Sequence, residues 1–109
     1  MNVKQLCENG SFSALTLPSP DREIKGVYIG DLLSWVMGRA SEDNAWITIM
    51  SNTNVIAVAT LTDVSCIILA EGVTLESDVL ATADAKGINV LVFKESAYEA
   101  ARALWTLGL

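Results

Sequence analysis

The stretch from residue 46 to residue 72 constrains the fold more than any other part of the chain. It contains the apolar runs Trp46–Met50, Val55–Leu61 and Ser65–Leu69, and a polar turn, Ser51–Asn54, follows the first of them. Short apolar runs bounded by turns are typical of strands that are buried on both faces of a parallel sheet. The stretch therefore predicts a buried strand, a crossing segment and a second buried strand.

The crossing segment Val55–Leu61 can be interpreted in two ways. Its β-branched residues favour a strand by propensity. Its position favours a helix, because two parallel strands need a crossover between them and a cluster of capping residues, Asn52 to Asn54, precedes the segment. We predict a helix.

The remaining elements follow from periodicity and capping residues. They are a helix at Val3–Glu8, strands at Ser11–Leu17 and Glu23–Ile29, a helix capped by Asp31 with Leu32, Leu33, Val36 and Met37 on its inner face, a helix at Leu75–Lys86 capped by Thr74, a strand at Ile88–Phe93, and a last helix that opens on a capping box at Ser96–Glu99. This order predicts an α/β fold, a small three-layer sandwich whose sheet is mostly parallel with right-handed crossovers.

Length and composition predict one apolar domain. The 109 residues correspond to a single domain, 1–109. Hydrophobic residues make up 51% of the chain and charged residues 18%, against roughly 25% charged in typical domains. Such an excess leaves apolar side chains on the surface, so we expect a homodimer.

The charge balance and the missing motifs exclude several functions. Thirteen acidic residues face seven scattered basic ones, which argues against nucleic acid as a partner. No apolar run reaches the ~18 residues of a membrane span, and the N-terminus lacks a signal-peptide pattern, so we expect a cytoplasmic protein without membrane contact. There is no histidine, no CxxC, no GxxxxGK[ST] and no GxSxG, so we expect no metal, no cofactor and no catalytic residue of those classes.

Polar turns that follow the predicted strands are the candidate ligand site, because ligands of open α/β sheets bind beyond the carboxyl ends of the strands. Asn52, Thr53 and Asn54 would place backbone N–H groups and the positive end of a helix there, which suits an anion, although these are also ordinary capping residues. Asp31 is either a helix cap or a contact for a ligand. Glu71, beside Gly72, is either a solvated turn carboxylate or a partner of Asp31 in acid–base chemistry.

Four segments carry a resemblance to a known family. They are Val27–Ser34, Trp46–Met50, Asn54–Ala59 and Cys66–Gly72. In these segments the chain resembles the DRTGG domain family, and in particular the short stand-alone members that are often encoded beside iron-only hydrogenase genes. The resemblance covers nearly the whole chain.

The resemblance implies a small α/β fold similar to the N-terminal domain of HPr kinase/phosphorylase, and a regulatory role. It does not imply kinase activity, because that activity belongs to a separate domain. The chain departs from the motif that names the family. It has Asn52-Thr53-Asn54 in place of Asp-Arg, and Ala70-Glu71-Gly72 in place of Thr-Gly-Gly, while we interpret Asp21-Arg22 as a coincidence.

Three functional hypotheses follow. The first is a non-catalytic regulatory or interaction domain that senses a small anionic ligand such as a nucleotide through Asp31, Asn52, Thr53, Asn54, Glu71 and Gly72. The second is an enzyme that acts on a phosphorylated metabolite with Asp31 and Glu71. The third is an accessory protein that docks on a hydrogenase-related or other redox partner.

Overall fold

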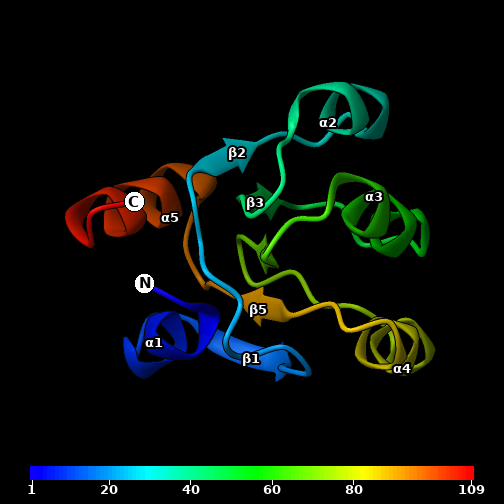
Figure 1. Ribbon diagram of the computed structural model, residues 1–109, viewed down its shortest axis with the longest axis horizontal. Coiled ribbons are helices and arrows are strands. Elements are labelled where there is room, and N and C mark those ends of the chain that lie inside the picture. The colour runs from blue at the N-terminus through cyan, green and yellow to red at the C-terminus, as the bar shows by residue number, and fades with distance from the viewer.

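A five-stranded sheet runs through the middle of the computed structural model, which describes all residues 1–109 (Figure 1). The order across the sheet is β1-β5-β4-β3-β2. β1 is antiparallel to β5, and the other neighbours are parallel. The strands are β1 (Ser13–Thr16), β2 (Val27–Ile29), β3 (Ala45–Thr48), β4 (Cys66–Leu69) and β5 (Val90–Val92).

Helices cover both faces of the sheet. One layer contains α1 (Val3–Glu8) and α5 (Ala97–Thr106), and the other contains α2 (Leu33–Arg39), α3 (Asn54–Thr62) and α4 (Ser77–Ala85), as Figure 1 shows. The predicted three-layer sandwich with a mostly parallel sheet is confirmed. No helix has the length and apolar character that crossing a membrane would need.

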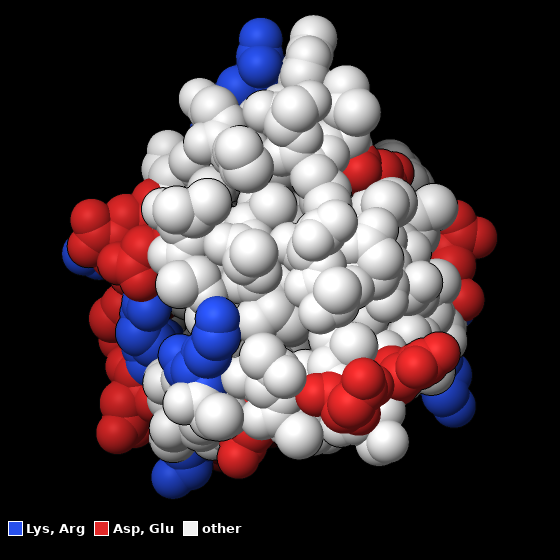
Figure 2. Space-filling view, turned by 90° about the vertical axis from the view of Figure 1, so that its right-hand side faces the viewer, with Lys and Arg blue, Asp and Glu red and all other residues white.

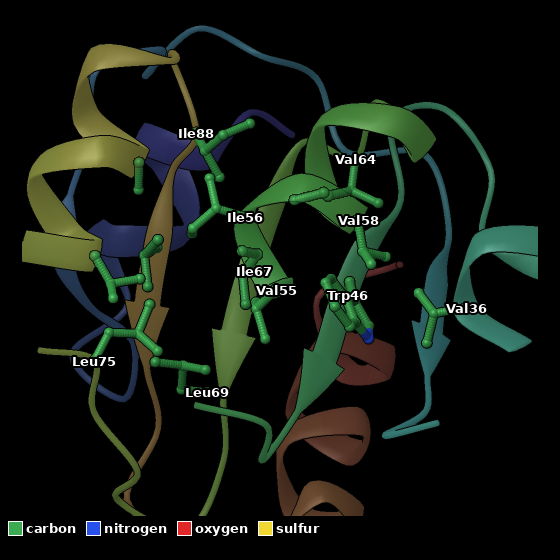
Figure 3. Close-up of a cluster of buried hydrophobic side chains, with 14 residues drawn as sticks. Val36, Trp46, Val55, Ile56, Val58, Val64, Ile67, Leu69, Leu75 and Ile88 are labelled. Carbon is green, nitrogen blue, oxygen red and sulfur yellow. The ribbon is translucent and has the colours of Figure 1, made fainter. Parts of the chain in front are cut away.

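The central strands divide the core into two clusters. All eight residues of β3 and β4 are buried. Their side chains alternate between the two faces, so that Trp46, Ile67 and Leu69 pack towards α2, α3 and α4 (Figure 3). Ile47 and Ile68 belong to the cluster on the side of α1 and α5. The predicted buried strands are confirmed, and so is the helix between them, because a crossover is required whatever the local propensity.

Two predicted helix starts are wrong. α2 begins at Leu33, and no side chain caps it, because the Asp31 carboxylate is bound to β3 instead. Of the predicted inner face of α2 only Val36 is fully buried, since this helix lies at the β2 edge and covers little of the sheet. α4 begins at Ser77 rather than directly after Thr74, and Leu75 is buried in the segment that leads into it.

Polar side chains close the amino-terminal edge of the sheet. The Arg22 guanidinium donates to the carboxylates of Asp43 at 2.8 Å and Asp63 at 3.0 Å. The buried Ser65 hydroxyl shares its one hydrogen between the carbonyls of Glu23 and Asp43, and the buried Asn89 amide donates to the carbonyls of Ser19 and Ser65. Arg22 therefore fastens the loops before β2, β3 and β4 together.

The Arg22–Asp43 pair predicts a pH dependence of stability. The hydrogen bond from Arg22 lowers the pKa of the Asp43 carboxyl. A carboxyl group whose pKa is lower in the folded state stabilises that state above its unfolded pKa of about 3.9, and the contribution is lost as the pH falls through the folded pKa. We expect Asp43→Asn to lower the Tm at pH 7, and the difference from the wild type to shrink below pH 4. Thermal unfolding followed by circular dichroism between pH 2 and 8 measures it, and a difference that is constant with pH would contradict the assignment.

Candidate functional site

Three polar turns gather at the carboxyl-terminal edge of the sheet. The strand register pairs Ile29 with Ile47, and Thr48 with Leu69, so β2, β3 and β4 end side by side. The turns that follow these strands contain five of the six residues that the sequence predicts as ligand contacts, and the sixth, Asn54, is the first residue of α3. The structure thus brings Asp31, Asn52, Thr53, Asn54, Glu71 and Gly72 to one edge, and all six are exposed.

The Asp31 carboxylate is held against the end of β3. One of its oxygens accepts hydrogen bonds from the Thr48 hydroxyl and from the backbone N–H of Ile49, both at 2.9 Å. The Thr48 hydroxyl in turn accepts from the N–H of Met50 at 3.2 Å. Asp31 therefore fixes the direction in which the chain leaves β3, and its second oxygen has no partner within the protein.

The loop before α3 has free hydrogen-bond donors. The Asn52 side chain accepts from the N–H of Asn54 at 2.9 Å, which orders the first turn of the helix. The backbone N–H groups of Ser51, Asn52 and Thr53 have no partner within the protein, and these residues are exposed. Three consecutive donors at the positive end of a helix are the arrangement that proteins use to bind anions.

The turn after β4 offers a carboxylate rather than backbone donors. Glu71 and Gly72 both have positive φ angles, 59° and 71°. The N–H of Glu71 donates to the Glu95 carbonyl at 2.7 Å, and that of Gly72 donates to the Phe93 carbonyl at 3.0 Å. These bonds hold Glu71 in a conformation that a residue other than glycine rarely adopts, and strain of this kind clusters at functional sites.

Asp31 and Glu71 lie over neighbouring strands but do not contact each other. Asp31 is bound to the end of β3 and Glu71 follows β4, and the N–H of Ala70 donates to the Thr48 carbonyl at 3.0 Å between them. No hydrogen bond joins the two carboxylates. The free donors follow β3, between Asp31 after β2 and Glu71 after β4, so the arrangement can hold a ligand that contacts donors and carboxylates at neighbouring strand ends.

Two shallow hollows lie at the same edge, beyond β5. Each has a volume of about 270 Å³, and they share Ser11, Phe93 and Glu95. Ligand pockets are usually at least about 300 Å³. None of the six predicted residues lines either hollow. Local sequence patterns do not bring Ser11 to this place, because it arrives only through the antiparallel pairing of β1 with β5. The polar pair Lys94-Glu95, directly after the predicted strand, is the signal in the sequence that could have located it.

The possible metal-ligating side chains are not clustered, and Cys66 lies outside this site. No three His, Cys, Asp or Glu side chains lie close enough together to hold a metal ion. Cys66 is fully buried among apolar side chains, and burial raises the pKa of its thiol to about 12. It packs as a small apolar residue of the core.

Comparisons with known proteins identify relatives of this fold. The profile of a family described as the DRTGG domain matches residues 18–107. Among solved structures, the chain is similar to the CBS and DRTGG domains of the regulatory region of Clostridium perfringens pyrophosphatase, a structure complexed with the activator diadenosine tetraphosphate. The TM-score is 0.72 at 17% identity, over 93% of this chain and 44% of that chain, so the likeness is one of fold and this chain spans less than half of that regulatory region. No curated protein matches the sequence.

The two hydrogen bonds that Asp31 accepts predict a stability difference between two substitutions. Asp31→Ala leaves the Thr48 hydroxyl and the Ile49 N–H without their acceptor, and we expect a loss of roughly 1–3 kcal/mol in the free energy of unfolding. Asp31→Asn keeps an oxygen in the same place, so its cost is expected to be well below that of Asp31→Ala. Urea unfolding of both variants checks this, and equal losses would show that the charge, rather than the hydrogen bonds, holds the loop.

Proposed function

The chain belongs to the DRTGG domain family, and from this premise we propose that it is a non-catalytic regulatory domain that senses a nucleotide at the carboxyl-terminal edge of its sheet. The observation that carries the proposal is the row of three free N–H groups at the start of α3, beside the fixed carboxylate of Asp31.

A nucleotide suits this edge better than inorganic phosphate does. The free N–H groups of Ser51, Asn52 and Thr53 match phosphate oxygens. The carboxylates of Asp31 and Glu71 accept hydrogen bonds, so they match the hydroxyls of a ribose, whereas they would repel a lone anion. A ligand that has both phosphates and ribose hydroxyls therefore makes favourable contacts with the N–H groups and with the carboxylates.

The relative of known structure supports a nucleotide as the ligand class. That structure is of a regulatory region, and it is complexed with an activator that consists of two adenosines joined by four phosphates. At 17% identity the likeness does not carry the position of that ligand to this chain. The site at the α3 turn is proposed from this chain's own residues.

The other expectations from the sequence belong to the same proposal. We propose that the protein is cytoplasmic, that it is a homodimer, and that a hydrogenase-related protein is a candidate partner for its acidic surface. The enzymatic alternative on Asp31 and Glu71 requires turnover of a phosphorylated metabolite that Asp31→Asn abolishes. The use of Asp31 as a structural acceptor favours the regulatory function over this alternative.

A thermal-shift screen tests the ligand class. A ligand that binds only the folded state at about 100 times its Kd stabilises it by about 2.7 kcal/mol, which raises the Tm of a domain of this size by roughly 10 °C. We expect a rise with adenosine or guanosine polyphosphates, including diadenosine tetraphosphate, and none with inorganic phosphate at equal concentration. If no nucleotide raises the Tm, nucleotide sensing is wrong.

Thr53→Asp tests the location of the site. An acidic residue at the start of a helix interacts favourably with its positive end, so we expect the unliganded variant to be at least as stable as the wild type. The same charge faces the ligand phosphate, and we expect the nucleotide Kd to rise at least tenfold by isothermal titration calorimetry.

Ser41→Asp is the matched control for this variant. It adds the same charge at an exposed position in the loop between α2 and β3, at the opposite edge of the sheet, and it should leave the Kd unchanged. Equal affinities of Thr53→Asp and the wild type would place the ligand elsewhere, and the hollows beyond β5 would be the next candidates.

A further inference from the structure

The outer side of α3 is unusual for a surface helix. None of the nine residues Asn54–Thr62 carries a charge. Its outward residues include Ala57, Thr60 and Leu61, and the Leu61 side chain is 73% exposed. Surface helices normally place charged and polar residues on their outer side, and helices that are apolar all round are buried. The outer side of α3 thus has the composition of a covered surface.

The neighbouring helix α2 extends this apolar surface. It lies beside α3 in the same layer (Figure 1), and the side chains of Trp35 and Met37 are each more than half exposed. Figure 2 shows this side of the molecule, where the middle is uncharged and the charged side chains lie around it. We call the outer surface of α2 and α3, with Trp35, Met37, Ala57 and Leu61, the α3 face.

We propose that the α3 face is the interface through which two copies of this chain form a homodimer. The inference rests on the homodimer of the proposed function and adds its location. The chain carries a net charge of −6, so two copies repel each other through most of their surface. The α3 face is a place where they can approach without bringing many like charges together.

The charges on the two flanking helices favour a second copy as the occupant. The only charge on α2 is Arg39, at its last residue, whereas the charges on α4 are Asp78 and Asp84. α3 lies between these helices, and all three run in the same direction, because each leads from the end of one parallel strand to the start of the next (Figure 1).

A two-fold axis parallel to α3 in the interface plane therefore places α2 of one copy opposite α4 of the other. Arg39 near the end of α2 then faces Asp84 near the end of α4 of the second copy, and the same pair forms again on the other side of the axis. This arrangement brings the uncharged middle of the two faces together and pairs Arg39 with Asp84 on both flanks. A standard interface covers about 800 Å² on each partner, which is roughly one-seventh of the 5601 Å² surface of this chain.

Leu61→Glu tests the apolar part of the interface. Leu61 is exposed, so the substitution should leave the circular dichroism spectrum and the Tm of the monomer close to those of the wild type. We expect a wild-type dimer by light scattering after size-exclusion chromatography, and a dimer Kd at least 100-fold higher for the variant by analytical ultracentrifugation. Trp105→Glu is the matched control, because Trp105 is 80% exposed on α5 in the opposite layer, and its Kd should not change.

A charge exchange tests the orientation of the two copies. We expect Arg39→Glu and Asp84→Arg each to raise the dimer Kd about tenfold, and the double variant to recover most of the loss, because the pair forms again with its signs exchanged. A dimer that survives Leu61→Glu overturns the α3 face as the interface, and so does a dimer that is broken by Trp105→Glu, while the homodimer itself stands. A wild-type chain that is monomeric at 100 µM overturns both the α3 face as an interface and the homodimer itself. The nucleotide result of the thermal-shift screen is unaffected by that outcome.

Discussion

The parallel pairing of β3 with β4 determines most of this structure. All eight residues of the two strands are buried, so neither face of the sheet can be left to solvent. Two helical layers are the consequence, and the short connections between parallel strands put one crossover helix after each of β2, β3 and β4. The turns on either side of these crossovers are then forced to opposite edges of the sheet.

The two edges of the sheet differ in how their hydrogen-bonding groups are paired. At the amino-terminal edge, Arg22, Ser65 and Asn89 use their donors within the protein and lock the loops together. At the carboxyl-terminal edge, free N–H groups precede α3, and Asp31 keeps one unused oxygen. The amino-terminal edge is therefore closed by internal hydrogen bonds, whereas the carboxyl-terminal edge combines one structural acceptor, Asp31, with donors that have no partner within the protein.

The sequence could predict what depends on local pattern and burial. Apolar runs located the buried strands β3 and β4, and the need for a crossover made Val55–Leu61 a helix despite its β-branched residues. It could not predict what depends on long-range hydrogen bonds. Asp31 has the identity and position of a helix cap, yet its carboxylate binds the end of β3, and nothing nearby in the sequence marks Thr48 as its partner. The hollows beyond β5 could not be predicted either, because the pairing of β1 with β5 is a long-range contact that brings Ser11 beside Phe93 and Glu95.

The turn at Glu71 and Gly72 has a mechanical consequence. Its two N–H groups are bonded to the carbonyls of Glu95 and Phe93, and Glu95 immediately precedes Ser96, the residue whose hydroxyl caps α5. A shift of Glu71 must therefore either break these bonds or pull on the start of α5, which lies on the other side of the sheet. Backbone hydrogen bonds thus link the turn after β4 directly to the start of α5, in the helical layer on the opposite face of the sheet from α3.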